Sequence, residues 1–391
     1  MATPGQNPQT QQGPTNAQLR QIVIANSVDA WQIIYQTTFT TGPGTVLNIP
    51  VRNVGLLKKF VVEIQANVQS PASTVTQTLQ SFGPSNLLSN VTFTDLSNQV
   101  RINTSGWHLT MLASAKSPPG AIGAAATTDT PLGFGNNFTQ VISAPATITT
   151  TTTANNVSMF YVVPIAYSDN DLRGGILASV VNATMNLQLT FNPNAFAAST
   201  VSDTTLAVYK SGGAAATMPS CTVIVYQNYL DQLPLLKNGQ GPLVPYGDLS
   251  VAYLLNNTAY SGIIANQDNP FSYANFRDFL STIVVYDNNG TLNVGGDVSY
   301  FAIQSANYTN IIKADPNLVA FWTRELMFDD FPKGCYYFDH RRKPISTIQY
   351  GNMNLIMNPV TVNSAAASVL IGYESLALIN MITNAGSISG T

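Results

Sequence analysis

Histidine and cysteine provide many of the catalytic and metal-binding groups in proteins, and this chain of 391 residues has only two of each. The histidines are His108 and His340, and the cysteines are Cys221 and Cys335. A zinc site brings Cys and His together at short spacings, and a nucleophilic enzyme pairs Ser or Cys with a base. The cysteines lie 114 positions apart, with no CxxC pair and no histidine at metal-ligand spacing. We therefore predict two reduced, buried thiols.

Both histidines have simpler structural explanations. His108 follows Trp107 in the segment Thr-Ser-Gly-Trp-His-Leu, and strand alternation would point the two rings in opposite directions. Because no Ser nucleophile elbow or Cys partner is visible, we interpret His108 as a hydrogen-bonded structural residue, with a catalytic base as the less favoured alternative. His340 lies in the densest charge cluster, Asp-His-Arg-Arg-Lys at residues 339–343. We expect a solvated turn or an intersubunit salt bridge there.

Ligand motifs for phosphate and calcium are incomplete. The basic run at 341–343 could attract a phosphate, but the Gly-Phe-Gly segment at 133–135 lacks the third glycine of a dinucleotide fingerprint. The Asp-Asn-Asp segment at 169–171 starts like a calcium loop, yet Arg173 occupies the next ligand position and no glutamate closes the loop. We predict a turn or a helix N-cap there instead. The sequence thus predicts no catalytic, cofactor-binding or metal-binding residue, and the chain is not expected to be an enzyme.

The scaffold that must position these residues carries unusually little charge. Only 35 residues are charged, 16 Lys or Arg and 19 Asp or Glu, which is 9% of the sequence, whereas most soluble domains are about a quarter charged. A chain this poor in solvating groups is expected to turn much of its surface toward other protein subunits. The net charge of −3 provides no basic field for phosphate backbones, so direct nucleic-acid binding is not expected.

The N-terminal 35 residues are predicted to form a flexible arm and a helix. Residues 1–16 are mostly Gln, Asn, Pro, Thr and Gly, a composition that cannot bury enough apolar surface to become ordered. Residues 17–35 carry two apolar stripes at helical spacing, so we predict a helix with two apolar faces and two partners. Arg20 is the only charged side chain before Asp29. The segment has no apolar secretory signal, which favours synthesis in a cytoplasm.

Two further features receive structural interpretations. In a protein made in the cytoplasm, glycosylation sequons are better interpreted as Asn- and Thr-rich strand chemistry; they begin at Asn90, Asn103, Asn137, Asn156, Asn182, Asn256, Asn289 and Asn307. The apolar segment 365–382 is interrupted at 373–375 and at 380, so it falls short of the about 20 apolar residues that a membrane-spanning helix needs. A buried strand is predicted there, with a transmembrane helix as the less favoured alternative.

From residue 36 onward the sequence has the texture of an all-β protein. Short runs rich in Val, Ile, Thr, Phe and Tyr are separated by Gly, Pro and Asn turns, which is typical of sandwiches and jelly rolls. A helix is predicted at 317–328, and ion pairs on its surface explain its charged residues, which are Arg324, Glu325, Asp329 and Asp330. The chain is longer than one typical core supports, and the Pro- and Gly-rich segment 237–247 is the best domain boundary.

Three local patterns recur in the same order on both sides of that boundary. One is an apolar strand leading into an Asp turn, which predicts a β-hairpin twice. The second is a strand ended by Asn-Pro, and the third is an apolar strand leading to tyrosine. The matched segments are 91–98 with 283–290, 189–193 with 355–359, and 223–226 with 369–373. The shared order favours a duplication of two similar β domains as a hypothesis.

Longer segments, spread in order along the chain, carry a family resemblance. In the first half these segments are Phe82-Gly83-Pro84-Ser85-Asn86-Leu87, Thr104-Ser105-Gly106-Trp107-His108-Leu109, Ala144-Pro145-Ala146-Thr147-Ile148, Val163-Pro164-Ile165-Ala166-Tyr167-Ser168 and Tyr229-Leu230-Asp231-Gln232-Leu233-Pro234. In the second half they are Leu280-Ser281-Thr282-Ile283, Asp330-Phe331-Pro332-Lys333-Gly334, Gln349-Tyr350-Gly351-Asn352 and Asn384-Ala385-Gly386. Together they resemble the major capsid protein of tectiviruses, the tailless icosahedral bacteriophages with a membrane inside the capsid. The resemblance covers nearly the whole chain, except the far N-terminus and the Thr-rich stretch after Ile148.

The resemblance implies an all-β fold of two tandem eight-stranded jelly rolls. With the boundary above, we expect an arm and helix at 1–35, the first roll at 36–236, a linker at 237–247 and the second roll at 248–391.

It also implies a major capsid protein that forms a homotrimer and tiles an icosahedral shell around an internal viral membrane. The N-terminal arm would lie toward that membrane, minor capsid or vertex proteins would be further partners, and assembly would take place in the host bacterial cytoplasm. The uncharged arm agrees, because a shell that touches nucleic acid directly is expected to present several Lys or Arg. The alternative is a receptor-binding or adhesin-type β-sandwich that works through exposed loops.

Overall fold

The structure is a computed structural model of the chain. It describes residues 14–40, 44–80, 83–116, 141–149, 151, 155–179, 184–198, 207–211, 213–236, 239, 241–288, 297–306, 310–327, 334–363 and 367–379. The predictions for residues 133–135, Asp329 and Asp330, and for most of the arm, lie outside this part of the chain.

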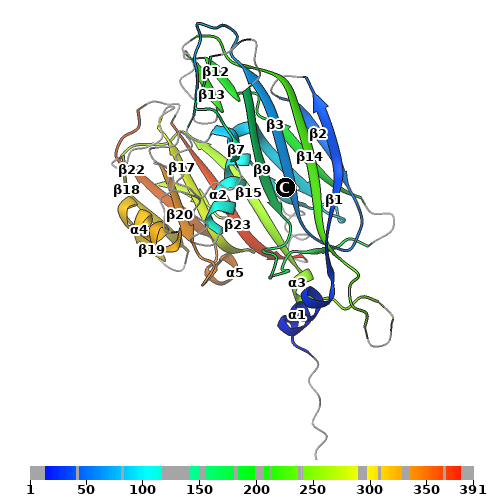
Figure 1. Cartoon of the computed structure of the whole chain (residues 1–391). Coiled ribbons are helices and arrows are strands. Elements are labelled where there is room, and N and C mark those ends of the chain that lie inside the picture. The colour runs from blue at the N-terminus through cyan, green and yellow to red at the C-terminus, as the bar shows by residue number, and fades with distance from the viewer. Residues whose placement is uncertain are drawn as a thin grey trace, which may run out of the picture.

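Eight strands form the first jelly roll, shown at the right of Figure 1. They are β1 (Val28–Phe39), β2 (Val46–Val51), β3 (Leu56–Gln69), β5 (Leu88–Thr94), β6 (Val100–Thr104), β9 (Asn155–Pro164), β11 (Met185–Phe191) and β14 (Thr217–Asp231). One layer has the order β1-β14-β3-β9 and the other has the order β2-β11-β5-β6. Their inner faces share one hydrophobic core.

The second jelly roll repeats this arrangement. Its strands are β15 (Val251–Ser261), β16 (Asn269–Ser272), β17 (Asp278–Asp287), β18 (Val298–Ser305), β19 (Ile312–Ala314), β20 (Cys335–Asp339), β22 (Met353–Pro359) and β23 (Ser368–Leu378). They form the layers β15-β23-β17-β20 and β16-β22-β18-β19. Numbered by position within each roll, both rolls have the orders 1-8-3-6 and 2-7-4-5, so the chain is a double jelly roll, as the resemblance implied.

Shorter elements complete the two rolls. The short strands are β4 (Gln77–Leu79), β7 (Val141–Ser143), β8 (Thr147–Ile148), β10 (Ile176–Leu177), β12 (Phe196–Ala198), β13 (Tyr209–Ser211) and β21 (Ile345–Ser346). The helices are α1 (Asn16–Asn26), η1 (Gly83–Leu87), α2 (Gly106–Lys116), α3 (Tyr246–Leu249), α4 (Pro316–Met327) and α5 (Thr347–Tyr350). The prediction of a helix at 317–328 is confirmed by α4.

The two rolls join along the edges of two layers. Strand β6 of the first roll pairs in parallel with β15 of the second, with Ile102 opposite Leu255 and Asn103 opposite Asn256. The layers β2-β11-β5-β6 and β15-β23-β17-β20 therefore form one continuous sheet. In Figure 1, helix α2 lies between the two rolls, while β1 and α4 lie toward opposite sides of the molecule.

Two of the three predicted repeat pairs fall on equivalent strands. Residues 189–193 and 355–359 lie on and just after the seventh strands, β11 and β22, and residues 223–226 and 369–373 lie on the eighth, β14 and β23. The first pair is wrong, because residues 91–98 belong to a fourth strand and 283–290 begin in a third. The hairpin at 91–98 is confirmed by the β5–β6 pairing. After β17 the next described strand, β18, belongs to another sheet, so these two form no hairpin.

The helix predicted over residues 17–35 is wrong in its second half. Helix α1 ends at Asn26, where the backbone N–H of Ser27 donates to the carbonyl of Val23. From Val28 the chain is extended and pairs with β14, from Val28 opposite Asp231 to Phe39 opposite Cys221. The ladder pairs backbone groups along the strand, with one register shift between Ile33 and Tyr35, and the apolar spacing of 28–35 is compatible with either a helix or a strand. Only Val23 of α1 is fully buried, so the helix does not have two covered faces.

The apolar segment 365–382 forms a strand where it is described. Strand β23 lies between β15 and β17 and is buried along nearly its whole length. The preference for a buried strand is confirmed. Among the described residues, no helix is long and apolar enough to cross a membrane.

Candidate assembly surfaces

His108 is a structural residue, but it lies in helix α2 and not in the strand that alternation suggested. Its Nδ1 atom is 2.6 Å from the Thr104 hydroxyl, and its side chain is fully buried. The ring lies so close to Gly372 of β23 that a Cβ atom there would be 2.3 Å from its Cδ2 atom. Burial lowers the pKa of His108 to about 4, so the ring is neutral near pH 7 and fills the contact between the rolls.

His340 is buried, which contradicts the predicted solvated turn at this position. Its backbone N–H donates to the carbonyl of Leu280 and so continues the β17–β20 ladder one residue past Asp339. Burial lowers the pKa of His340 to about 4. The Asp339 carboxylate accepts hydrogen bonds from Arg341 at 2.9 and 3.1 Å. The exposed part of this cluster is therefore limited to Arg342 and Lys343.

The cysteines are free and buried, as predicted. Cys221 lies on β14 and Cys335 on β20. Burial raises the pKa of the Cys221 thiol to about 12, so little reactive thiolate forms at neutral pH. In the part of the chain that the structure describes, no three His, Cys, Asp or Glu residues gather where they could hold a metal ion.

The two carboxylates of the Asp-Asn-Asp segment at 169–171 form ion pairs with lysine and arginine side chains. Asp169 binds Lys59 at 2.8 Å and Lys58 at 3.7 Å. Asp171 binds Arg173 at 2.7 Å and Arg20 at 3.5 Å. Burial favours the neutral acid of Asp171, but the hydrogen bonds from Arg173 outweigh it and lower the pKa. The segment is therefore a turn with structural ion pairs, as expected, and not a calcium loop.

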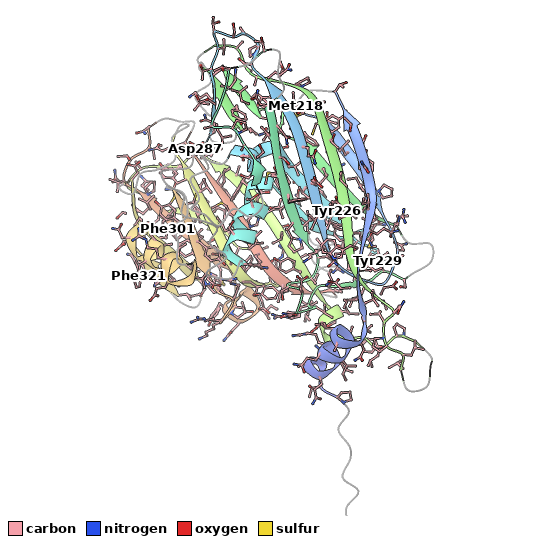
Figure 2. All side chains as sticks on the ribbon, viewed as in Figure 1. Met218, Tyr226, Tyr229, Asp287, Phe301 and Phe321 are labelled. Carbon is pink, nitrogen blue, oxygen red and sulfur yellow. The ribbon has the colours of Figure 1, made fainter. Side chains whose placement is uncertain are left out.

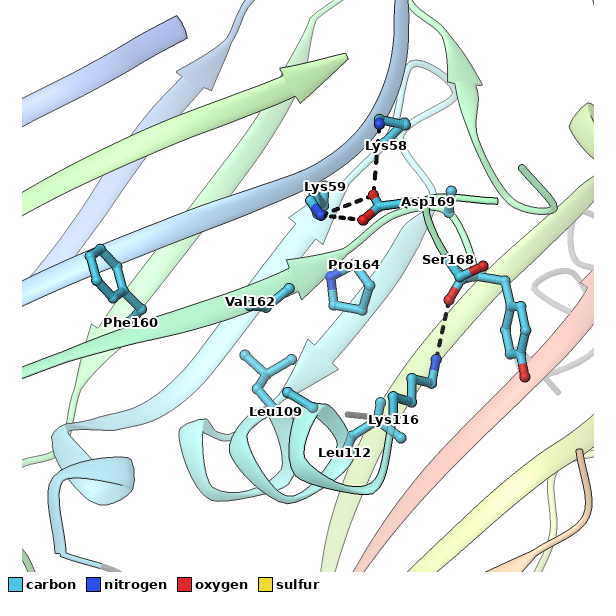
Figure 3. Close-up of a pocket in the computed structure, with 13 residues that line it drawn as sticks. Lys58, Lys59, Leu109, Leu112, Lys116, Phe160, Val162, Pro164, Ser168 and Asp169 are labelled. Carbon is cyan, nitrogen blue, oxygen red and sulfur yellow. Dashed lines mark hydrogen bonds and ion pairs between the residues drawn. The ribbon is translucent and has the colours of Figure 1, made fainter. Parts of the chain in front are cut away.

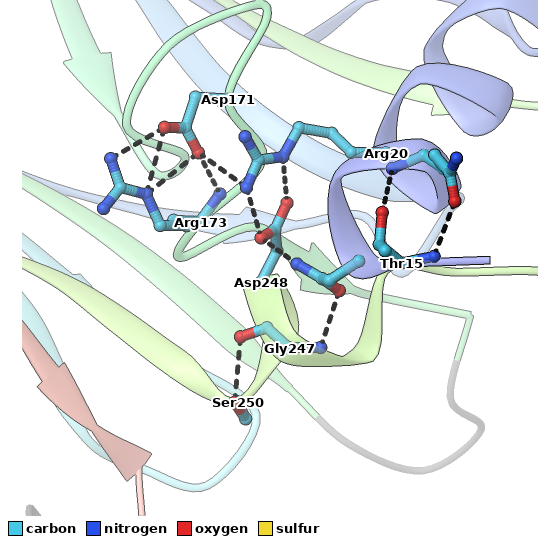
Figure 4. A network of polar contacts seen from close by, with 9 residues as sticks. Thr15, Arg20, Asp171, Arg173, Gly247, Asp248 and Ser250 are labelled. Carbon is cyan, nitrogen blue, oxygen red and sulfur yellow. Dashed lines mark hydrogen bonds and ion pairs between the residues drawn. The ribbon is translucent and has the colours of Figure 1, made fainter. Parts of the chain in front are cut away.

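A polar network holds helix α1 against both rolls (Figure 4). Asp248, on α3, accepts hydrogen bonds at 2.6 Å from the side chains of Arg20 and Asn16. The Asn16 side chain accepts a hydrogen bond from the Gly247 backbone N–H at 3.0 Å. The bonds to Asp248 raise the pKa of Arg20. The lone positive side chain of the N-terminal segment thus fixes the helix to the start of the second roll and, through Asp171, to the first.

A buried ion pair that was not predicted from the sequence lies between the rolls. Glu374 of β23 is fully buried and contacts Lys116 of α2. Its carboxylate also accepts hydrogen bonds from Tyr253 at 2.8 Å and from Ser281 at 2.6 Å. Burial would raise the pKa of Glu374, but these partners lower it below its ordinary value. The available signal was a single glutamate inside the apolar run of β23.

A pocket of about 460 Å³ opens between α2 and the first roll. Its apolar lining includes Leu109 and Leu112 of α2 and Val162 of β9. Its rim carries Lys58 and Lys59, which bind Asp169, as Figure 3 shows. The pocket therefore combines an apolar lining with lysines whose charge is already paired.

The outer face of the sheet β1-β14-β3-β9 presents apolar side chains toward solvent. The register aligns one row across four strands: Ile33, Tyr226, Val61 and Val162. Ile33 is 47% exposed and the other three are half-buried. Trp31, two residues before Ile33, is 51% exposed. Figure 2 shows Tyr226 on this sheet.

Helix α4 presents a second apolar surface on the other roll. Leu318, Phe321 and Trp322 lie at helical spacing on one face and are 38%, 52% and 36% exposed. Val319 and Thr323 are buried on the side that faces the roll. Figure 2 shows Phe321 on the outside of α4, at the opposite side of the molecule from Tyr226. Exposed apolar patches of this kind mark surfaces that contact other proteins.

Sequence comparison identifies relatives along the whole chain. Residues 9–233 match the P3 major capsid protein N-terminal family, and residues 250–390 match the P3 major capsid protein C-terminal family. The major capsid protein P3 of Enterobacteria phage PRD1 is 40% identical over 378 residues, which cover 96% of this chain and 94% of that protein.

Structural comparison finds the same fold in proteins of very different sequence. The major capsid protein of Sulfolobus Turreted Icosahedral Virus is 10% identical, with a TM-score of 0.61 over 89% of this chain and 97% of that chain. VP54 of PBCV-1 is 11% identical, with a TM-score of 0.55 over 90% of this chain and 94% of that chain. These matches support the double jelly roll.

The double jelly roll, the whole-length relationship and the exposed apolar surfaces agree with a capsid role. The comparisons give no support to the receptor-binding or adhesin alternative. The chain belongs to the P3 major capsid protein family and is therefore a structural protein of the virion capsid and not an enzyme.

Proposed function

We propose that three copies of this chain form a homotrimer and that the trimers tile an icosahedral shell around an internal viral membrane. The observation that carries the trimer is the pair of uncovered apolar surfaces at opposite sides of one chain, the outer face of β1-β14-β3-β9 and the outer face of α4. Surfaces that are not self-complementary join head to tail, and such contacts form a ring where the rotation between copies closes, which the proposal places at three copies.

The N-terminal arm would lie on the membrane side of the shell. Its support is chemical, because Arg20, the only charged side chain before Asp29, is already bound by Asp248. An arm with no other charged side chain has little attraction for nucleic acid. It can instead approach lipid or neighbouring subunits without leaving a charge unpaired.

The domain boundary, the further partners and the place of assembly belong to the same proposal. A linker at 237–247 agrees with the two family matches, which end at 233 and begin at 250. Minor capsid or vertex proteins would contact the trimers, and assembly would take place in the host bacterial cytoplasm. This role requires no catalytic, cofactor-binding or metal-binding residue.

The first test is the absolute mass of the purified protein by light scattering after size exclusion, repeated after mild heating. A persistent three-chain species is expected, and a clean monomer would contradict the trimer.

The second test removes the arm and helix. Deletion of residues 1–26 is expected to leave a folded trimer that assembles shells poorly, with shells counted by electron microscopy. The cut is placed before Val28 because deletion to residue 35 would remove most of β1. If deletion of residues 1–26 gave monomers, the segment would be needed for trimer formation, which would contradict a role confined to shell assembly.

A further inference from the structure

Three exposed apolar side chains lie next to one another at one end of the second roll. At Asp278, β17 pairs with β23 on one side and with β21 on the other. Counting two positions back along both registers brings Phe276 between Leu378 and Ile348, the second residue of α5. These side chains are 45%, 43% and 49% exposed. We call the three of them the end row.

The backbone holds the central residue of the end row in an unfavourable conformation. Phe276 has a φ of 58°, in the left-handed region that a bulky residue adopts only where its surroundings fix it. Buried Thr347 fixes this turn: its hydroxyl accepts a hydrogen bond from the Arg277 N–H at 2.9 Å and donates to the Ala274 carbonyl at 3.2 Å. A glycine would fit this backbone better. Packing within the chain therefore does not explain why an aromatic ring is displayed here.

The equivalent end of the first roll is covered. There the third and eighth strands, β3 and β14, pair Leu56 with Leu230, as β17 and β23 pair in the second roll. Both leucines are buried in a small cluster with Val23 of α1. Helix α1 therefore covers the end of the first roll, whereas the end row of the second roll has no such cover among the described residues.

Two exposed cations accompany the end row. Arg342 and Lys343 lie in the turn that joins β20 to β21, and both of these strands pair with β17. In the described part of the chain neither cation forms an ion pair, because the neighbouring carboxylate of Asp339 is bound by Arg341. The other carboxylate at this end, Asp278, is half-buried. The surface thus joins exposed apolar groups to positive charge.

We infer that the end row enters the surface of an anionic lipid membrane and that Arg342 and Lys343 bind the phosphate groups of its lipids. Aromatic and aliphatic side chains beside Lys or Arg are the pattern of proteins that lie on such surfaces. A second copy of this end fits less well, because it would bring the same cations together. In Figure 1 the end of the second roll that carries α5 faces the same way as α1. The inference rests on the proposed internal membrane and adds a lipid contact separate from the arm.

The first experiment measures flotation of the purified full-length protein with lipid vesicles. We expect it to float with vesicles of phosphatidylcholine and phosphatidylglycerol in equal amounts and to stay behind with phosphatidylcholine alone. Lys343→Glu is expected to lower the partition coefficient at least about 30-fold, since it changes the charge at the lipid surface by two units in each chain. Lys210→Glu is the matched control, because Lys210 lies on β13 at the opposite end of the molecule (Figure 1).

A second variant separates lipid binding from a structural role of the ring. Phe276→Gly relieves the backbone and removes the ring, so the thermal unfolding midpoint should stay or rise while the partition coefficient falls at least about 10-fold. Ile264→Gly is the control, because Ile264 is an exposed apolar residue beyond the far end of β15. A lower midpoint with unchanged flotation would show that the ring serves folding and would overturn the inference.

Insertion of the ring can be observed directly. In Phe276→Trp, vesicles with brominated acyl chains are expected to quench the emission added by the new indole, whereas the emission added in Ile264→Trp should persist. Quenching requires contact with the acyl chains, so it does not follow from electrostatic attraction alone. Equal emission of Phe276→Trp with brominated and ordinary vesicles would overturn the inference.

The outcomes separate the inference from the proposed function. If deletion of residues 1–26 abolishes flotation while Lys343→Glu and Phe276→Gly leave it unchanged, the arm alone binds the membrane and the end row does not. If the unsubstituted protein binds no vesicle, the inference is wrong, and the trimer is still decided by its mass. A chain truncated after Ile379 that floats when the full chain does not would show that residues 380–391 cover the end row, which also overturns the inference.

Discussion

The layers β1-β14-β3-β9 and β15-β23-β17-β20 share one strand order but differ in what covers their outer faces. Strand β3 alternates between buried and partly exposed residues, whereas β17 is buried almost continuously. Alternation is the pattern of a sheet with one solvated face, and continuous burial is the pattern of a sheet covered on both faces. The two rolls therefore share a topology. The side chains on each outer face differ according to whether another part of the chain covers that face.

A glutamate on each layer shows the same contrast. Glu63 on β3 is partly exposed and accepts a hydrogen bond from Tyr226 at 3.1 Å. Glu374 on β23 is fully buried beside Lys116, Tyr253 and Ser281. Water can solvate the first carboxylate, whereas only protein groups can stabilise the second. Substitutions in the two layers should therefore differ most in their cost in unfolding free energy where they remove a charged side chain.

The largest difference is expected between Glu374→Ala and Glu63→Ala. Removing Glu374 leaves Lys116, whose side chain is only 21% exposed, without its carboxylate partner, which should lower the free energy of unfolding by about 3–5 kcal/mol. Removing Glu63 should cost less than about 1 kcal/mol, because the site is partly solvated. Equilibrium urea unfolding measures both. Equal costs would show that the two outer faces are equally solvated.

Truncation of apolar side chains should show the same contrast, with a smaller difference in the free energy of unfolding. Ile283→Ala, on the covered face of β17, is expected to cost about 2–5 kcal/mol in the free energy of unfolding. Val61→Ala, on the open face of β3, should cost below about 1 kcal/mol in the unassembled subunit. Urea unfolding of the unassembled subunit, with and without each truncation, makes the comparison. A large cost for Val61→Ala in the unassembled subunit would show that its face is already covered within one chain.

Acid should weaken the covered contact through His108. Burial lowers the pKa of His108 to about 4, and the unfolded side chain titrates near pH 6.5. Between these values the unfolded state binds more protons, so the stability conferred by the neutral ring is complete above pH 6.5 and declines as the pH falls toward 4. At pH 5 the loss is about 2 kcal/mol.

His340 has a similarly lowered pKa and is expected to add a comparable loss. His108→Gln should therefore reduce the change in unfolding free energy between pH 7 and pH 5 by about half. The measurement is urea unfolding at the two pH values. An unchanged dependence on pH in the variant would rule out titration of His108 as a cause.

The smallest expected effect comes from a single methyl group at the contact of α2 with β23. Gly372→Ala places a Cβ atom 2.3 Å from the His108 ring, and relief by small shifts should leave a cost of about 1–3 kcal/mol. Thermal unfolding of Gly372→Ala, His108→Ala and the double variant measures the coupling. We expect the double variant to cost less than the sum of the single variants. Additive costs would contradict a direct steric contact.

Much of the fold could be predicted from local patterns, because strand texture, proline stops and turn residues act over short distances. The buried strand at β23 and the helix α4 were predicted in this way, and two repeat pairs fell on equivalent strands. The prediction was wrong where both the helical and the strand periodicity of apolar residues fit one segment. Residues 28–35 satisfy helical spacing, but pairing with β14 makes them a strand. The Asp turns at 95 and 287 look alike locally, yet only the first is followed by its hydrogen-bonded partner strand among those described.

The candidate surfaces were less accessible to sequence reasoning than the fold. His340 was expected in solvent because of its charged neighbours, but the ladder to Leu280 continues past Asp339 and buries it. Glu374 was recognised only as an interruption of an apolar run. Its importance depends on Lys116, which is 258 positions away in the chain and meets it only when the rolls pack.

By itself the sequence determined a low-charge, strand-rich chain with duplicated patterns and a recognisable capsid family, since these depend on residue types and short spacings. Tertiary structure alone decided which face of each layer is open. That property depends on contacts between residues distant in the chain: β6 with β15, α2 with β23 and Arg20 with Asp248. A strand's own residues show that a face is apolar, and only the packing of the two rolls shows whether this chain covers that face or leaves it open to another.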